Sequence, residues 1–513
     1  MTQIKHTLST TREGDFAQWY QEVISEAEMA EESGVRGCMV IRPWGYGIWE
    51  RIQALMDADI KAAGVQNCYF PLFIPLSYFA KEAEHVEGFA KEMAVVTHHR
   101  LISDGKGSLT PDPEAKLEEP LVVRPTSETV IGAAMSRWVQ SWRDLPLLTN
   151  QWANVVRWEM RTRMFLRTSE FLWQEGHTAH ADREDAMSET LRALAMYRAF
   201  AENVLAMPVI TGEKPENERF PGAVATYSIE AMMQDGKALQ AGTSHYLGTG
   251  FAEAAGIQYQ NKEGQQALCH TTSWGVSTRL IGGVIMTHGD DDGLRVPPRI
   301  APWQIVILPM LRDTEEDAAV LAYCEALRHA LAQLRAFGEP LRVLHDKRPG
   351  KATQKRWIWV KKGVPLILEI GGRDAANGQV SALRRDQLWR ADAKPNFVAQ
   401  TKDAFIASAA SELEAIQSSL FTEAKAKRDA NIVRHIDSLD ALAKFYAEDQ
   451  RYPGWVELCW SKPTGAELED TVAQLKALKL SIRNTPLDGE PVSGTCIFTG
   501  KPAVERIYVA RAY

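Results

Sequence analysis

Residues 154–180, NVVRWEMRTRMFLRTSEFLWQEGHTAH, constrain the fold more than any other stretch of the chain. The opening valines predict a strand that carries Arg157 and Glu159 on one face, because alternate strand residues share a face. A polar, basic turn is expected at 161–163. The returning strand is then expected to include Phe165, Arg167, Phe171, Trp173 and Glu175.

This predicted hairpin has two interpretations. An isolated RxRxxxR pattern is typical of a solvated basic tip. Here the apolar flanks indicate a hairpin that belongs to the core, where several arginines can converge on one anion. We therefore favour an anion-binding hairpin.

The composition is that of an ordinary folded protein of two to four domains. The 513 residues are 24% charged and 45% hydrophobic, with a net charge of −8. That balance does not indicate a nucleic-acid binder, although a local basic face can exist on an acidic chain. The six cysteines are scattered without a CxxC pair, which fits free thiols in a reducing cytoplasm. Neither a signal peptide nor a membrane-spanning run is expected.

The form RWE…FLRTxEFLWQEGH resembles motif 2 of the class II aminoacyl-tRNA synthetases. It is most similar to the prolyl-tRNA synthetases of the archaeal/eukaryotic type, and the resemblance extends over nearly the whole chain. It implies an α+β protein with an antiparallel-sheet catalytic domain at 1–300. An α/β anticodon-binding domain would follow at 301–405, then a connecting helix and a small α/β C-terminal domain at 406–513.

The N-terminal residues resemble motif 1 of the same class. An acidic amphipathic helix is expected at 14–33, a second helix with apolar residues at 3.6-residue spacing between 43 and 64, and a strand at 65–70. In the family this helix and strand form a homodimer interface, but the pattern alone fits a plain core helix equally well. Residues 80–97 also resemble the family, and 102–118 are expected to form a polar surface loop.

Residues 121–129, LVVRPTSET, are expected to end a strand at Arg124 and to begin a helix that continues to 142. Thr or Ser at this point can cap that helix. By resemblance, Thr126 and Glu128 also bind the ammonium of the amino acid. The secondary ammonium of proline has two N–H donors, which one hydroxyl and one carboxylate can accept.

Two later stretches resemble the rest of the catalytic site. In DGKALQAGTSHYLG, at 235–248, Gly242 would let the backbone approach a ligand, the alternative being a glycine-containing turn. In SWGVSTRLIGGVIMTH, at 273–288, a strand leads into a helix whose Gly282 and Gly283 permit close packing. This second stretch resembles motif 3.

The resemblance implies a role for each candidate residue. Arg157 would bind the α-phosphate of ATP and the proline carboxylate, and Arg279 the γ-phosphate. His245 would border the proline pocket, whose walls would be formed by Phe171 and Trp173. Further contacts with ATP are implied for Glu159, Arg167, Thr168, Gln240, Thr243 and Ser277. Mg²⁺ is expected to accompany ATP, with no metal site on the protein itself.

Two other patterns do not predict a metal site. The run Asp290–Asp292 is flanked by glycine and is expected to form a solvated turn, because metal ligands normally converge from several segments. His177 and His180 would lie on opposite faces of a strand.

From residue 303 onwards, apolar strands alternate with helices. The first of these helices is expected at 315–336. This alternation predicts an α/β domain. It resembles the anticodon-binding domain of several class II synthetases. Glu369 and Arg373 could read base edges. A cluster that could bind phosphates, or could be a solvated basic loop, comprises Lys347, Arg348, Lys351, Lys355, Arg356, Lys361 and Lys362.

Residues 402–447 predict a long connecting helix, and the residues after it resemble a C-terminal domain that often carries a four-cysteine zinc site. Cys496 is retained here, but Thr499 stands where a second cysteine is expected, and Asn484 and the region around Ser461 replace the other two. Cys459 lies close to one expected position but not on it. Two thiolates do not complete a tetrahedral site, so we expect no zinc and a domain stabilised by hydrophobic packing.

The resemblance implies a homodimeric enzyme that acts on L-proline, ATP and tRNA(Pro). The stretch between motifs 2 and 3 is too short for an editing insertion, so no hydrolysis of alanyl-tRNA(Pro) is expected. Two alternatives remain. One is a synthetase for threonine, glycine or histidine, which the TSE and WQEGH motifs disfavour. The other is a silent paralogue that binds tRNA or protein, which the intact Arg157, Arg279, Thr126 and Glu128 disfavour.

Overall fold

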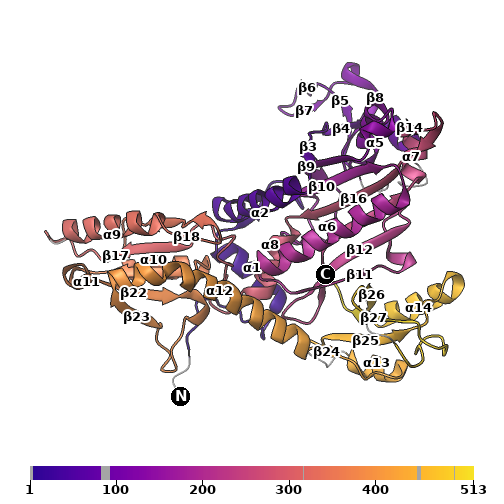
Figure 1. Ribbon diagram of the computed structural model, residues 1–513. Coiled ribbons are helices and arrows are strands. Elements are labelled where there is room, and N and C mark those ends of the chain that lie inside the picture. Colours follow the sequence, from indigo (N-terminus) through magenta and orange to yellow (C-terminus); the bar gives the residue numbers. More distant parts are fainter. Residues whose placement is uncertain (1–3, 82–92, 316, 448–451, 490–491) are drawn as a thin grey trace.

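The computed structural model describes residues 4–81, 93–315, 317–447, 452–489 and 492–513 (Figure 1). Its largest element is an 11-stranded sheet with the order β24-β25-β27-β26-β11-β12-β13-β16-β10-β9-β3. A separate five-stranded sheet has the order β20-β17-β21-β22-β23. This mixed architecture confirms the predicted α+β class with a smaller α/β unit.

The central part of the large sheet comes from the first half of the chain. Its strands are β3 (Gln66–Asn67), β9 (Leu147–Val156), β10 (Glu170–His180), β11 (Val209–Glu213), β12 (Ala225–Met232), β13 (Ala238–Gly248) and β16 (His270–Ser277). The C-terminal residues add β24 (Ile432–Val433), β25 (Trp455–Trp460), β26 (Ser481–Pro486) and β27 (Glu505–Ala510). The two parts are joined by antiparallel pairing of β11 with β26. One sheet therefore continues from the centre of the molecule into the C-terminal residues.

Helices cover this sheet, and their buried faces follow the apolar periodicity of the sequence. They are α1 (Phe16–Glu26), α2 (Pro43–Ala62), α5 (Glu128–Trp138), α6 (Arg183–Asn203), α7 (Gly250–Ala255) and α8 (Arg279–His288). Helix α2 starts at Pro43, whose missing N–H costs nothing in the first turn, and buries Ile48, Ile52 and Ile60. Close packing of α8 is confirmed, because a Cβ on Gly282 would lie 2.5 Å from Leu166.

The expected helix over 14–33 is too long. It ends at Glu26, after which Glu28 adopts a left-handed φ of 52° and the Met29 N–H donates to the Ile24 carbonyl at 2.9 Å. The chain then forms β1 (Ala30–Glu32), which pairs with β2 (Met39–Ile41). The strand expected at 65–70 is likewise reduced to β3.

The hairpin at 154–180 exists, but its strands are shorter than expected. β9 ends at Val156 and β10 begins at Glu170, so Arg157, Glu159 and Arg167 lie in the connecting loop instead of on a strand. Phe165 has φ of 61°, and the Arg163 N–H donates to the Arg167 carbonyl in a tight turn. This local turn replaces the expected cross-strand hydrogen bonds, so Arg157 and Arg167 do not follow the alternating directions of strand residues.

A small layer lies beyond the β9 side of the sheet (Figure 1). It comprises β4 (Phe73–Pro75), α3 (Leu76–Lys81), β5 (Val95–His98), β6 (Leu101–Ser103), β7 (Leu109–Pro111), β8 (Lys116–Val123), β14 (Gln258–Gln260) and β15 (Gln266–Leu268). The surface loop expected over 102–118 is mostly exposed, but it is not without regular structure, because β6 pairs with β7 and β8 begins at Lys116. Most of the stretch 80–97 lies outside the described residues.

The five-stranded sheet and its helices form the predicted α/β unit. Its elements are β17 (Ile305–Pro309), α9 (Asp317–Ala332), β18 (Arg335–Ala336), β19 (Glu339–Pro340), β20 (Val343–His345), α10 (Ala352–Lys361), β21 (Leu366–Ile370), α11 (Gly372–Asn377), β22 (Gln379–Arg384) and β23 (Phe397–Thr401). Helix α9 ends four residues before the expected position, because Arg335 and Ala336 form β18.

The expected single helix over 402–447 is also too long. Helix α12 (Lys402–Ala430) ends before β24, and α13 (Leu439–Phe445) and α14 (Gly465–Ala477) follow separately. Leu458, Leu475 and Ile507 belong to a distinct apolar core in these C-terminal residues. Within the described parts of the chain, no helix has the length and apolar character needed to span a membrane.

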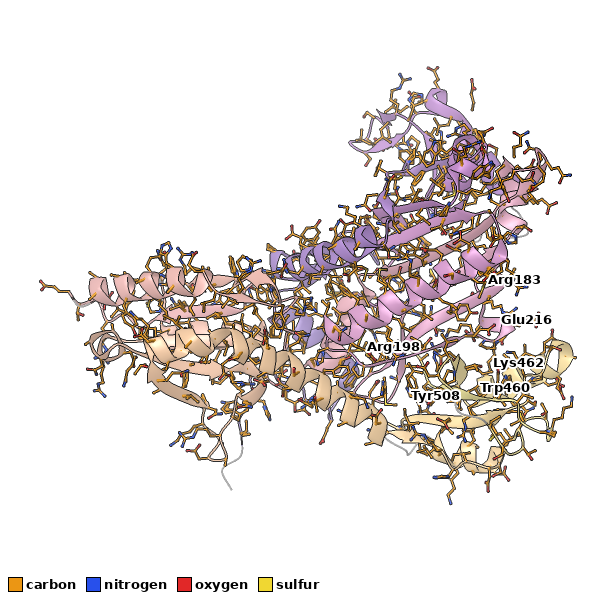
Figure 2. All side chains as sticks on the ribbon, viewed as in Figure 1. Arg183, Arg198, Glu216, Trp460, Lys462 and Tyr508 are labelled. Carbon is orange, nitrogen blue, oxygen red and sulfur yellow. The ribbon has the colours of Figure 1, made fainter. Side chains whose placement is uncertain are left out.

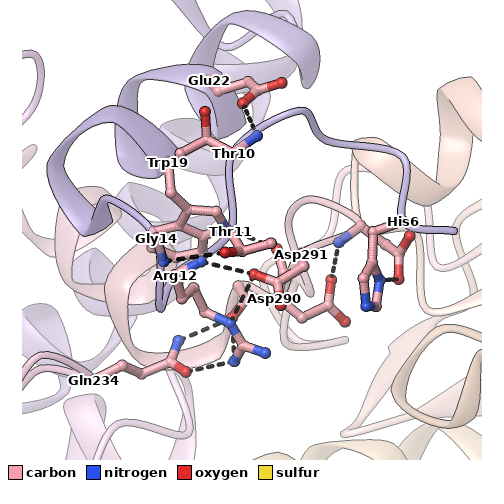
Figure 3. Close-up of polar contacts among 12 residues, drawn as sticks. His6, Thr10, Thr11, Arg12, Gly14, Trp19, Glu22, Gln234, Asp290 and Asp291 are labelled. Carbon is pink, nitrogen blue, oxygen red and sulfur yellow. Dashed lines mark hydrogen bonds and ion pairs between the residues drawn. The ribbon is translucent and has the colours of Figure 1, made fainter. Parts of the chain in front are cut away.

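The three consecutive aspartates after α8 do not form the solvated turn that we expected. Asp290 accepts two hydrogen bonds from Arg385, at 2.7 and 2.5 Å, and Asp291 accepts from Arg12. The Asp292 carboxylate is bonded to His6 and to the indole of Trp389. Figure 3 shows the N-terminal segment crossing this turn. The aspartates thus fasten the N-terminus and the α/β unit to the end of α8.

Replacing Arg385 by Met should lower the free energy of unfolding by about 2 kcal/mol, because it removes the ion-pair partner of the partly buried Asp290 carboxylate. Burial alone would raise the pKa of Asp290, but the guanidinium lowers it below its ordinary value. The ion pair should therefore stabilise the protein above about pH 4 and cease to do so as the pH falls through the lowered pKa. Denaturant unfolding at pH 7 and pH 3 measures both effects. Arg390→Met, at an exposed arginine of the same unit, should change stability by less than about 0.5 kcal/mol.

Candidate active site

A cavity of about 290 Å³ opens on the central strands of the large sheet, with its walls on β10, β12, β13 and β16. It brings together ten of the residues singled out in the sequence: Thr126, Glu128, Arg157, Phe171, Trp173, Gln240, Thr243, His245, Ser277 and Arg279. These residues come from four separate stretches of the chain, at 121–129, 154–180, 235–248 and 273–288. The fold thus assembles them at one place.

One end of the cavity is formed where β8 passes into α5. The Thr126 hydroxyl donates to the Glu128 carboxylate, so the two side chains form one oxygen-rich edge. Ser127 occupies the N-cap position of α5, but its side chain does not cap the helix. Its hydroxyl instead donates to Glu175 at 2.6 Å. The capping expected from Thr or Ser at this point is therefore wrong.

Arg157 lies in the cavity directly after β9. Its Nε donates to the Pro125 carbonyl at 2.7 Å, and its guanidinium carbon lies 5.7 and 5.4 Å from the ring centres of Phe171 and Trp173. These contacts fix the plane of the guanidinium through a hydrogen bond and two aromatic faces. Burial lowers the pKa of Arg157, while the Glu128 and Glu175 carboxylates raise it. A fixed, charged fork suits a carboxylate or a phosphate.

A buried pair beneath Arg157 was missed in the sequence. The His177 imidazole lies 2.9 Å from the Glu175 carboxylate, which also accepts from the Gln151 amide at 2.6 Å. Burial alone would lower the pKa of His177, but the hydrogen bond to Glu175 raises it above its ordinary value. The alternation of β10 could have indicated both residues, since Phe171, Trp173, Glu175 and His177 are two residues apart.

The pKa of His245 is shifted in the opposite direction from that of His177. Its Nδ1 lies 3.0 Å from the Thr226 hydroxyl, and its ring lies 4.8 Å from that of Phe220. Burial and the nearby His177 lower the pKa of His245 to about 3. The imidazole is therefore neutral near pH 7 and can accept or donate one hydrogen bond without adding charge.

The opposite end of the cavity is strongly positive. Arg279 is the first residue of α8, and its Nε donates to the Leu166 carbonyl at 3.2 Å. Burial together with the charges of Arg167 and Arg157 lowers the pKa of Arg279 to about 10, so it stays protonated at neutral pH. Gln240, Thr243 and Ser277 line the cavity beside it. Converging cations in a partly buried cavity form a site for a polyanion.

Three other candidates lie around the cavity without lining it. The Glu159 carboxylate accepts from the Arg161 backbone N–H at 2.7 Å. Arg167 is exposed, though close enough to Arg279 to lower its pKa. Thr168 lines a separate cavity of about 680 Å³, on the side of the loop that faces Gly37.

The loop between β11 and β12 also contributes to the cavity. It supplies Glu218, Arg219, Phe220 and Pro221 to the lining. No motif marks these residues. Their proximity depends on the antiparallel pairing of β12 with β13, which sequence alone does not reveal.

Known proteins match the chain over its whole length. A family model described as the class II tRNA synthetase core domain (G, H, P, S and T) matches 112–288, and an anticodon binding domain matches 304–393. A proline–tRNA ligase of Novosphingobium aromaticivorans is 79% identical over 510 residues, which cover 99% of each chain. The chain belongs to the proline–tRNA ligase family. A ligase of Sphingopyxis alaskensis is 73% identical, over 99% of this chain and 96% of that ligase. One of Erythrobacter litoralis is 68% identical over the full length of both chains.

The enzyme is therefore a class II aminoacyl-tRNA synthetase, a ligase of protein biosynthesis. Its anticodon-binding domain contains both residues considered for base recognition. Glu369 is buried on β21 with the Arg356 guanidinium 3.3 Å away, and burial raises its pKa. Arg373 is exposed on α11.

Much of the basic cluster in this domain is paired with carboxylates of the enzyme. Lys361 and Lys362 bond Glu26 and Glu28, and Lys347 bonds Glu325 at 2.9 Å. Arg348 bonds Asp346 at 2.7 Å. These pairs reduce the positive potential that the seven residues would otherwise present.

The C-terminal domain does not hold the donor set of a zinc site. The Ser461 and Thr499 hydroxyls lie 2.8 Å apart. Burial alone would raise the pKa of the Cys496 thiol, but hydrogen bonds with Thr499 and Ser461 lower it. Asn484 instead bonds the Ile210 carbonyl of β11. Among the described residues, no three His, Cys, Asp or Glu side chains group as metal ligands. Hydroxyls stand where thiolates would be needed, so the residues do not fit zinc.

Proposed function

We propose that the enzyme activates L-proline with ATP and transfers it to tRNA(Pro). The observation that carries this proposal is the single cavity in which the oxygen-rich edge of Thr126 and Glu128 faces Arg157, with Arg279 at the other end. The proline carboxylate attacks the α-phosphorus of ATP, which gives prolyl-adenylate and pyrophosphate. A ribose hydroxyl at the 3′ end of tRNA then accepts the prolyl group. Because the substrate supplies the nucleophile, the enzyme acts by alignment and charge stabilisation.

We infer the amino-acid end of the cavity from its chemistry. Thr126 and Glu128 accept the two N–H donors of the proline ammonium. Phe171 and Trp173 form walls for the pyrrolidine ring, and the neutral His245 closes the pocket without a second charge. Arg157 binds the proline carboxylate and, as the reaction proceeds, the α-phosphate of ATP that the carboxylate attacks.

The nucleotide is assigned to the positive end of the cavity. Arg279 binds the γ-phosphate. The remaining contacts with adenine, ribose and phosphate are assigned to Glu159, Arg167, Thr168, Gln240, Thr243 and Ser277. Mg²⁺ enters with ATP and neutralises part of its charge. Glu369 and Arg373 are the candidates for anticodon recognition.

Charging of tRNA(Pro) transcripts with labelled proline tests the whole proposal. We expect prolyl-tRNA to accumulate with tRNA(Pro) and not with tRNA(Ala). A folded enzyme that charges neither transcript with proline would contradict the proposal.

We assign the chain to the archaeal/eukaryotic type of prolyl-tRNA synthetase, although the relatives described above are bacterial. Supporting features are a C-terminal domain after the anticodon-binding domain and the short connection from β10 to α8. The domain limits are proposed at 1–300, 301–405 and 406–513.

Because the connection from β10 to α8 holds no editing insertion, the enzyme should activate alanine weakly and should not hydrolyse alanyl-tRNA(Pro). Incubation with purified alanyl-tRNA(Pro) measures this. Deacylation faster than in buffer would contradict it.

The C-terminal domain should contain no zinc. Its apolar core and the hydroxyl pair described above support this prediction. After washing with chelator, metal analysis should detect less than about 0.1 zinc per chain, and the melting temperature should not change. A value near one zinc per chain would refute it.

We also propose a cytoplasmic homodimer. Free cysteines fit a reducing compartment. Large apolar side chains are exposed on and near β4–β7, including Tyr69 (73%), Phe73 (47%) and Leu109 (69%). Exposed apolar side chains of this kind are suited to contact with a second copy. Light scattering should give twice the mass of one chain, and a single-chain mass would contradict dimerisation.

A further inference from the structure

A buried three-residue cluster joins the C-terminal domain to the centre of the large sheet. The Glu230 carboxylate on β12 accepts from Lys214 at 2.7 Å and from Arg483 on β26 at 2.8 Å. The side chains of Lys214, Glu230 and Arg483 are 1%, 0% and 7% exposed. Ordering and desolvating three charges in this way is expensive, and a contact between domains could be made with apolar residues instead.

The strand register places this cluster at the nucleotide end of the cavity. Thr226, which lines the cavity, is four residues before Glu230 on β12, and the pairing of β12 with β13 shifts register between Ile229 and Glu230. Glu230 is paired directly with Gln240 of β13, and Gln240 also lines the cavity. Thr226 in turn is paired with His245, at the end assigned to proline. Movement along β12 from Thr226 to Glu230 therefore leads from the proline end towards the ATP end.

The charges of the cluster are not balanced internally. Two cations and one carboxylate leave an excess of one positive charge within the three-residue cluster. Burial lowers the pKa of Lys214, whereas Arg483 and Lys214 hold the pKa of Glu230 below its ordinary value against the effect of burial. The charge of Arg483 also contributes to lowering the pKa of Arg279, and that of Glu230 to raising it. Both residues therefore act electrostatically on the arginine assigned to the γ-phosphate.

We propose that Arg483, held by Glu230, is a positioning residue through which the C-terminal domain completes the site for the triphosphate of ATP. This inference rests on the proposed function, because it takes the anion in the cavity to be ATP. Glu230 orients Arg483 and limits the repulsion between it and Arg279 while the site is empty. When the triphosphate binds, its negative charge meets the excess positive charge. A domain without a zinc site thus retains a role in the first step of the reaction.

The test is to measure the KM for ATP and the KM for proline separately in ATP–pyrophosphate exchange with the full-length enzyme. Arg483→Gln should raise the KM for ATP about tenfold, while the KM for proline stays within about twofold. Arg483→Lys retains the charge without the fork and should give an intermediate value for ATP. If Arg483 only held the two domains together, Arg483→Gln would lower the stability of the enzyme without selectively raising the KM for ATP.

Arg198→Gln provides a matched control. Arg198 lies on α6 (Figure 2) and also reaches the C-terminal domain, through Asp488 at 3.0 Å. It is partly exposed and is not among the residues that line the cavity. Neither KM should change in this variant.

A melting temperature lowered by Arg483→Gln with an unchanged KM for ATP would overturn the inference. If Arg483→Gln does not fold, Arg483→Lys decides, and a wild-type KM for ATP in that variant overturns the inference as well. The rise in melting temperature on addition of ATP separates this inference from the proposed function. Wild-type enzyme stabilised by ATP but inactive with proline would contradict the proposed amino acid. If ATP raises the melting temperature of the wild type and of Arg198→Gln but not that of Arg483→Gln, the result would support a role of Arg483 in binding the triphosphate.

Discussion

Arg157→Ala should reduce proline-dependent ATP–pyrophosphate exchange by about a thousandfold, in a protein that still folds. The substitution removes the cation between the amino-acid and nucleotide ends of the cavity, where the attacking carboxylate and the α-phosphate must come together. It also removes the contacts with the Phe171 and Trp173 rings. Exchange at saturating ATP and proline, with circular dichroism as the folding check, measures the effect.

Two further variants make that result specific. Arg157→Lys keeps the positive charge but loses the planar fork, and most of the activity should still be lost. Arg137→Ala removes an exposed arginine of α5 that bonds the Ala133 carbonyl of its own helix, and it should leave exchange unchanged. Near-normal turnover in folded Arg157→Ala would refute the assignment of Arg157.

Glu128→Ala should raise the KM for proline about a hundredfold and leave the KM for ATP within about twofold. The carboxylate is the charged acceptor assigned to the proline ammonium, and it lies at the end of the cavity away from Arg279. Its loss also leaves the Thr126 hydroxyl without the acceptor to which it donates. Steady-state exchange, with each substrate varied in turn, measures the two constants.

Glu128→Gln retains an oxygen acceptor without the charge, so its KM for proline should lie between those of the wild type and Glu128→Ala. Equal increases in both KM values would indicate a general loss of structure. An unchanged KM for proline would exclude Glu128 from the amino-acid site.

Local sequence patterns predicted those parts of the fold that depend on local interactions. The periodicity after Pro43 identified α2, and the motif stretches gave β10, β13, β16 and α8. Element ends were less accurate. Left-handed residues at Glu28 and Phe165 end α1 and form a turn in the loop after β9, and nothing in these non-glycine residues indicates such a conformation. Ten of the motif residues nevertheless line one cavity, because their chemistry depends on residue type more than on the exact length of the strands.

The remaining errors concern long-range contacts. The run Asp290–Asp292 looks like a solvated turn because its partners are almost a hundred positions later, at Arg385 and Trp389, or near the N-terminus, at Arg12. The pairing of β11 with β26, which brings Arg483 to Glu230, is equally remote in sequence. Such contacts follow from the packing of whole domains, and no local pattern encodes them.

The most direct test of the account is ATP–pyrophosphate exchange with each of the twenty amino acids, without tRNA. This reaction needs both ends of the cavity and no other part of the translation machinery. We predict the strongest exchange with proline and a weaker signal with alanine or cysteine. Strongest exchange with a different amino acid, or no exchange with any of them in folded protein, would contradict the account.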